Sequence, residues 1–124
     1  MSELAYTLIV DVETLAMLRQ AQIPGEPDFV AELVEALAIE APELLAQMRG
    51  ALLSHNAVTL RRAAHSLKSA AGNLGARRLR DVCEALELMA SSGDTSGADP
   101  LVERAQHEYD QALVALNAEV LAGG

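Results

Sequence analysis

Apolar residues along this chain recur at the spacing of an α-helix, and polar or helix-breaking residues divide them into five segments. We expect a short helix after Asp11 and longer helices at about 28–53, 56–74, 76–91 and 100–121. Pro42 lies inside the second segment, so we expect either a kink or a break into two helices there. Residues 1–10 form either a short strand or an extended lead-in.

Cap and turn residues support these boundaries. Asp11, Asp28 and Asn56 are each suited to an N-cap, and Gly75 can end the helix that Asn56 begins. Asp99 followed by Pro100 is typical of an N-cap and the first helical position. Long helices with short connections pack as antiparallel neighbours. The sequence therefore predicts an all-α fold, an antiparallel up-down four-helix bundle with a short extra N-terminal helix across one end.

The length and composition bound the class of protein. A chain of 124 residues is expected to form one domain, 1–124, with a bundle core at about 28–121. No apolar run approaches the roughly 20 residues of a membrane helix, and the N-terminus lacks the layout of a signal peptide. The single cysteine, Cys83, lies on an apolar stripe and is expected to be a buried thiol. Because a lone cysteine favours a reducing compartment, we expect a cytoplasmic protein without membrane contacts.

Charge is distributed unevenly along the chain. The net charge is −9, yet no Asp or Glu occurs between Glu43 and Asp81. The basic residues of this interval are Arg49, Arg61, Arg62, Lys68, Arg77, Arg78 and Arg80. One basic region suits a small anionic group or an acidic partner, whereas a nucleic acid would require broader neutralisation of phosphates. Alternatively, arginine serves there only as a good helix former on solvated faces.

His65 is the one candidate for a reactive side chain. At helical spacing it lies opposite the apolar side of its segment, so its imidazole is expected to face water. Its neighbours one and two turns away are Arg61, Arg62, Lys68, Ser69 and Gly72. The ring would be surrounded by cations, with a small, flat surface on its C-terminal side. An exposed imidazole can act as a nucleophile, although a surface histidine without a function is common.

Other kinds of site are not supported. A carboxylate–metal site in a bundle requires Glu-x-x-His pairs, and none of the three histidines has an acid three residues before it. No phosphate-binding loop of the Walker type and no G-x-S-x-G turn occurs. We therefore expect no metal and no cofactor in this chain.

The residues around His65 resemble a known family. Ala64-His65-Ser66-Leu67-Lys68-Ser69, then Asn73-Leu74-Gly75-Ala76, Leu79 and Leu86-Glu87, are similar to the motif of the histidine-containing phosphotransfer (HPt) family. That motif is A-H-x-L-K-[GS], followed by small residues, L-G-A and L-E. The family more often has Asp at the position of Asn56 and Gly at that of Ser69, where Ser remains small. The helix layout extends the resemblance over most of the chain.

The resemblance implies a phosphorelay intermediate without kinase activity of its own. His65 would accept a phosphoryl group on Nε2 from a receiver-domain aspartate and pass it to another receiver aspartate. Lys68 would neutralise charge near that group, and Glu87 would hold the other ring nitrogen. Ser69 and Gly72 would leave room for the receiver, and Arg61, Arg62, Arg77 and Arg78 would dock it. The implied partners are response-regulator receiver domains and a sensor (hybrid) histidine kinase, with Mg²⁺ on the receiver.

Two other interpretations remain open. The chain could be an HPt-like module of a chemotaxis-type histidine kinase, in which an ATP-bound kinase domain phosphorylates His65 directly. It could also be a non-catalytic helical adaptor whose basic region docks an acidic partner.

Overall fold

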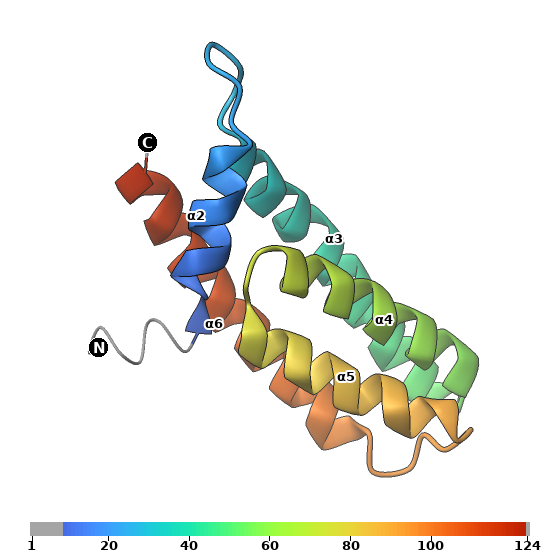
Figure 1. The fold of residues 1–124 in the computed structure, drawn as a ribbon. Helices are drawn as coiled ribbons and strands as arrows, with labels where there is room; N and C mark the ends of the chain where they lie inside the picture. Colours follow the sequence, from blue (N-terminus) through green and yellow to red (C-terminus); the bar gives the residue numbers. More distant parts are fainter. Residues whose placement is uncertain (1–8, 124) are drawn as a thin grey trace.

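The computed structural model describes residues 9–123, in which all the regular secondary structure is α-helical and no strand occurs (Figure 1). Its helices are α2 (Val12–Gln20), α3 (Phe29–Leu53), α4 (Ala57–Asn73), α5 (Arg77–Ser91) and α6 (Asp99–Gly123). The all-α prediction is confirmed. The expectation for the first ten residues falls mostly outside the described part, although Ile9 and Val10 are buried in the core.

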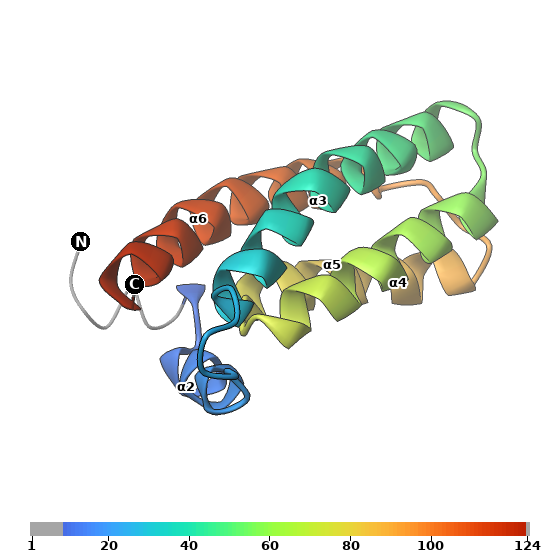
Figure 2. The same cartoon turned by 90° about the horizontal axis from the view of Figure 1, so that it is seen from above.

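Helices α3 to α6 form the four-helix bundle that the helix pattern predicts (Figure 1). Each helix packs on the next one in the sequence, and α6 returns to pack on α3. Figure 2 shows the short helix α2 at one end of the bundle, opposite the turn that joins α3 to α4. The predicted position of the extra N-terminal helix is therefore confirmed.

The core is built mainly from leucine and alanine. On α4 the apolar side is buried as expected at Leu60, Ala63 and Leu67, so the opposite side of this helix faces solvent. Cys83 of α5 is also buried, and desolvation raises the pKa of its thiol to about 12. The prediction of a buried thiol is confirmed.

Helix boundaries agree with the predicted caps at three of four positions. The side chains of Asp11, Asp28 and Asn56 each accept a hydrogen bond from a backbone N–H in the first turn of the following helix. The prediction for Asp99 is wrong by one residue, because α6 begins at Asp99 itself and the Ala98 carbonyl accepts from Val102 N at 3.0 Å. An acidic residue in the first turn still interacts favourably with the helix dipole.

Helix α3 runs unbroken through Pro42, so the alternative of two separate helices is wrong. Ala41 and Leu45 are fully buried beside the proline. Their packing keeps the helix on the core although Pro42 cannot donate a backbone hydrogen bond. A kink at this position stays a prediction.

The corner between α4 and α5 is fixed by α2. Asp11 N donates to the Gly75 carbonyl at 2.8 Å, and an Arg77 guanidinium nitrogen lies 2.6 Å from Asp11 Oδ2. Gly75 has a φ of +74°, and a Cβ there would lie 3.0 Å from the Asp11 carbonyl oxygen. Glycine is therefore required both by the backbone conformation and by the close approach of α2. This corner sets how α4 and α5 lie side by side.

Candidate functional site around His65

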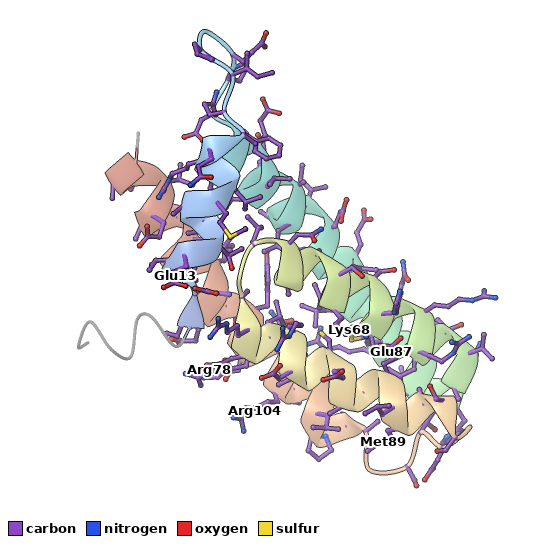
Figure 3. All side chains as sticks on the ribbon, viewed as in Figure 1. Glu13, Lys68, Arg78, Glu87, Met89 and Arg104 are labelled. Atoms are coloured by element: carbon purple, nitrogen blue, oxygen red, sulfur yellow. The ribbon has the colours of Figure 1, made fainter. Side chains whose placement is uncertain are left out.

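The candidate site lies on the groove between α4 and α5. His65 is in the middle of α4, and its side chain is 60% exposed, as the helical spacing predicts. Glu87 extends from α5 toward α4, where Figure 3 shows it close to Lys68. Two adjacent helices therefore supply one cluster of polar side chains.

Glu87 joins His65 to Lys68. Its Oε2 lies 2.7 Å from His65 Nδ1, and its Oε1 lies 2.5 Å from Lys68 Nζ. An ionised carboxylate can only accept hydrogen bonds, so Nδ1 must be the ring nitrogen that carries the hydrogen. The lone pair of the neutral ring is then on Nε2. The expected contact between Glu87 and the ring is confirmed.

Lys68 and Glu87 each stabilise the charged form of the other. The hydrogen bond from Lys68 is the largest cause that lowers the pKa of the Glu87 carboxyl; desolvation opposes it, and the hydrogen bond from His65 lowers the pKa further. In turn, the hydrogen bond to Glu87 raises the pKa of the Lys68 ammonium. Both groups are therefore charged at neutral pH, and Lys68 is bonded to Glu87 beside the ring.

The exposed surface of α4 on the C-terminal side of His65 includes Ser69 but only part of Gly72, so it is less extensive than the sequence predicts. Ser69 is exposed one turn along α4, as expected. Gly72 is half-buried instead, and a Cβ there would lie 3.5 Å from Arg80 Cδ of α5. The expectation that Gly72 adds to an open, flat face is wrong, because the aliphatic part of Arg80 already lies over it.

Of the four arginines assigned to docking, Arg61 and Arg62 are exposed beside the ring. Together with His65, Ser66 and Glu87 they line a hollow of about 370 Å³. Their position agrees with a surface that meets a partner, although their role stays a prediction.

The other two, Arg77 and Arg78, are used within the protein. Arg77 pairs with Asp11, and Arg78 lies 2.8 Å from Glu108 Oε1. Glu108 of α6 is only 1% exposed, and Arg104 lies 3.5 Å from the same oxygen. Arg77 and Arg78 therefore form ion pairs within the protein, and their role in docking stays a prediction. The sequence offered one unused signal, because Glu108 falls on the apolar stripe of α6.

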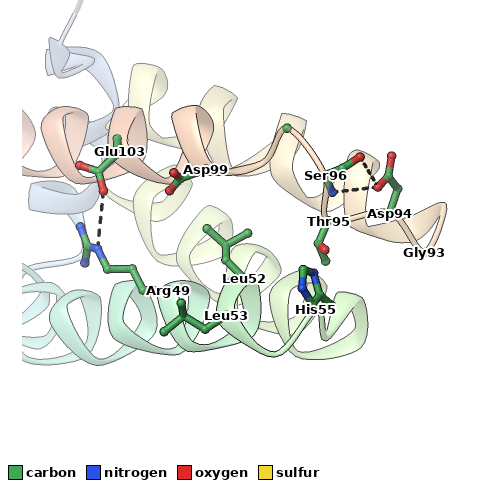
Figure 4. Close-up of a pocket in the computed structure, with 11 residues that line it drawn as sticks. Arg49, Leu52, Leu53, His55, Gly93, Asp94, Thr95, Ser96, Asp99 and Glu103 are labelled. Carbon is green, nitrogen blue, oxygen red and sulfur yellow. Dashed lines mark hydrogen bonds and ion pairs between the residues drawn. The ribbon is translucent and has the colours of Figure 1, made fainter.

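A larger hollow, of about 680 Å³, lies at the other end of the bundle between the end of α3 and the α5–α6 loop (Figure 4). It is lined by Leu52, Leu53 and His55, and its Arg49 lies 3.8 Å from Glu103. None of its lining residues belongs to the His65 cluster. Within residues 9–123 no group of three His, Cys, Asp or Glu side chains is placed to hold a metal ion. The helices of this part of the chain are too short or too polar to span a lipid bilayer.

Comparison with known proteins agrees with this geometry. The family model of the Hpt domain matches residues 32–119. Histidine-containing phosphotransfer protein 5 of Arabidopsis thaliana is 28% identical over 116 residues, which cover 86% of this chain and 74% of that protein. The crystal structure of histidine-containing phosphotransfer protein B from Pseudomonas aeruginosa PAO1 matches with a TM-score of 0.80 and 28% identity. That match covers 90% of this chain and 93% of the other.

Proposed function

The chain belongs to the Hpt domain family and is a histidine phosphotransfer intermediate of phosphorelay signalling, and we propose that His65 carries the phosphoryl group. HPt proteins work in two-component phosphorelays with kinases and response regulators. One observation supports the assignment to His65 most directly. Its ring is exposed to solvent, while Glu87 holds Nδ1 at 2.7 Å and leaves Nε2 free.

In the proposed transfer, the lone pair of Nε2 attacks the phosphorus of an aspartyl phosphate on a receiver domain. The N–P bond forms as the O–P bond of the acyl phosphate breaks, and the electron pair stays on the receiver's carboxylate. No proton has to move, because Nδ1 keeps its hydrogen and its hydrogen bond to Glu87 before and after the N–P bond forms. The second transfer is the reverse of this step on another receiver. Such a reaction depends mainly on positioning and charge neutralisation.

The proposal extends to the partners and the setting. The donor and acceptor would be receiver domains of response regulators and of a hybrid sensor kinase. The receiver would bring the Mg²⁺, and this chain would supply the oriented imidazole and cationic side chains around it. We place the protein in the cytoplasm, as a partner of other proteins without nucleic acid or membrane ligands.

A label-transfer experiment tests the proposal. Candidate receiver domains carrying labelled phosphate are mixed with the wild-type protein, with His65→Gln, and with the control variant His107→Gln. The wild type and His107→Gln should acquire an acid-labile label, and His65→Gln should acquire none. Transfer to His65→Gln would disprove the assignment. Labelling of His65 by ATP and a kinase domain, with no transfer from any receiver, would favour a kinase module instead.

A further inference from the structure

Two arginines beside His65 differ from the other basic residues in having no carboxylate partner. Within residues 9–123 most basic side chains lie within 4 Å of an Asp or Glu oxygen. Those so paired are Arg19, Arg49, Lys68, Arg77, Arg78, Arg80 and Arg104. Arg61 and Arg62 form no such pair with any described residue. In a chain of net charge −9, Arg61 and Arg62 therefore present uncompensated positive charge beside His65.

Arg61 and Arg62 lie in the turn of α4 that precedes His65, and the His65 side chain is directed toward this turn. The Cα–Cβ bonds of an α-helix tilt toward its N-terminus, so the side chain of His65 lies over the turn that holds Arg61 and Arg62. The hollow of about 370 Å³ beside the ring is lined by these two arginines, Ser66 and Glu87. Lys68 does not line it. A group attached to the free Nε2 would therefore lie near the guanidinium groups of Arg61 and Arg62 and the hydroxyl of Ser66.

The charges of His65, Lys68 and Glu87 also favour Arg61 and Arg62 as the residues that bind the phosphoryl group. Glu87 is already neutralised by Lys68, whose Nζ lies 2.5 Å from Oε1. A phosphoryl group on Nε2 adds negative charge that this pair does not compensate. Guanidinium groups match the oxygens of a phosphoryl group with paired N–H donors, which an ammonium cannot do.

Taking His65 as the phosphoryl acceptor, as proposed above, we propose that Arg61 and Arg62 form the binding site for its phosphoryl group. Their guanidinium groups bind the phosphoryl oxygens during transfer, rather than only attracting the receiver. Lys68 then acts as a positioning residue that keeps Glu87 oriented toward Nδ1.

Phosphoramidate separates binding of the phosphoryl group from docking of a receiver, because this small donor has no protein surface. In its reaction the Nε2 lone pair forms the N–P bond of phosphohistidine, the donor's own P–N bond breaks, and ammonia leaves with the electron pair. The test variant is Arg61→Gln/Arg62→Gln. Its matched control is Arg49→Gln/Arg104→Gln, which removes two positive charges from α3 and α6.

We expect phosphoramidate to label the Arg61/Arg62 double variant at least about tenfold more slowly than the wild type, the effect of one charged hydrogen bond. The control should be labelled within about twofold of the wild type, because exposed charges elsewhere are screened by salt. Circular dichroism should show equal helicity for all three proteins. Equal labelling rates for the test variant and the wild type would overturn the proposed binding site and leave His65 as the acceptor. A wild type that takes no label on His65 would overturn the proposed function as well.

Discussion

Glu87 of α5 lies 2.7 Å from the imidazole Nδ1 of His65 on α4, a contact between side chains 22 residues apart in the sequence. The same carboxylate bonds Lys68 through its other oxygen at 2.5 Å. One acidic residue thus orients the ring and holds a cation beside it.

Removal of Glu87 should change the tautomer of His65. Without an acceptor at Nδ1, a larger share of neutral rings carries the hydrogen on Nε2, where it blocks attack. Glu87→Ala should therefore slow phosphoryl acceptance by at least about tenfold, as for other residues that fix an imidazole tautomer. Glu87→Gln keeps an acceptor oxygen and should lose less. Nitrogen chemical shifts of His65 measure the tautomer directly, and a slow Glu87→Ala variant with wild-type shifts would contradict this account.

Lys68 should act largely through Glu87. Lys68→Ala is expected to raise the pKa of the Glu87 carboxyl toward its ordinary value, because the Lys68 hydrogen bond is the largest cause of its lowering. It should also slow transfer, but add little to the effect of Glu87→Ala. Transfer rates of the two single variants and the double variant measure this coupling. Effects that add to within about 0.5 kcal/mol would show that Lys68 acts independently of Glu87.

The surface next to His65 should tolerate a change at Gly72 better than one at Ser69. Ser69 is exposed, so Ser69→Trp should weaken receiver binding and slow transfer by blocking approach to the ring. Gly72→Ala should transfer normally, because its Cβ would make an ordinary contact at 3.5 Å with Arg80. Gly72 lies in the last turn of α4, so this replacement should also stabilise the fold, by less than the roughly 0.5–1 kcal/mol found in helix interiors. Receiver titrations and urea unfolding measure the two effects, and normal transfer by Ser69→Trp would place docking elsewhere.

Arg78 should contribute to stability more than to docking. Arg78→Ala leaves the buried Glu108 with only Arg104, at 3.5 Å. Because Arg78 is 44% exposed, we expect the lower part of the usual range, a loss of about 1–2 kcal/mol in urea unfolding. Arg78→Met/Glu108→Met removes both charges and should recover most of that loss. Unchanged stability with slower, salt-dependent receiver association would instead make Arg78 a docking residue.

Local signals in the sequence account for most of the fold. Asp28 and Asn56 begin helices because their side chains accept backbone hydrogen bonds, and this depends only on the residues that follow. The exposure of His65 follows in the same way from the helical period on α4. Pro42 shows the limit of such signals, since buried neighbours on both sides keep α3 continuous.

The contacts that the sequence did not predict are those between side chains of different helices, because they depend on how the helices pack. Arg77 and Arg78 have the composition of a docking patch, but their partners come from α2 and α6. The contact of Glu87 with His65 was expected only through the resemblance to a family, because spacing along the chain does not determine which face of α5 meets α4. The stem of Arg80 over Gly72 likewise follows from the packing of these two helices.

The position of the phosphorus atom tests the central claim most directly. The ¹⁵N-labelled protein is phosphorylated by a phospho-receiver, and the coupling of ³¹P to nitrogen is measured by NMR. The account predicts one phosphorus bonded to Nε2 of His65, with Nδ1 still protonated and facing Glu87. Phosphorus on Nδ1, on a serine hydroxyl or on another histidine would contradict it.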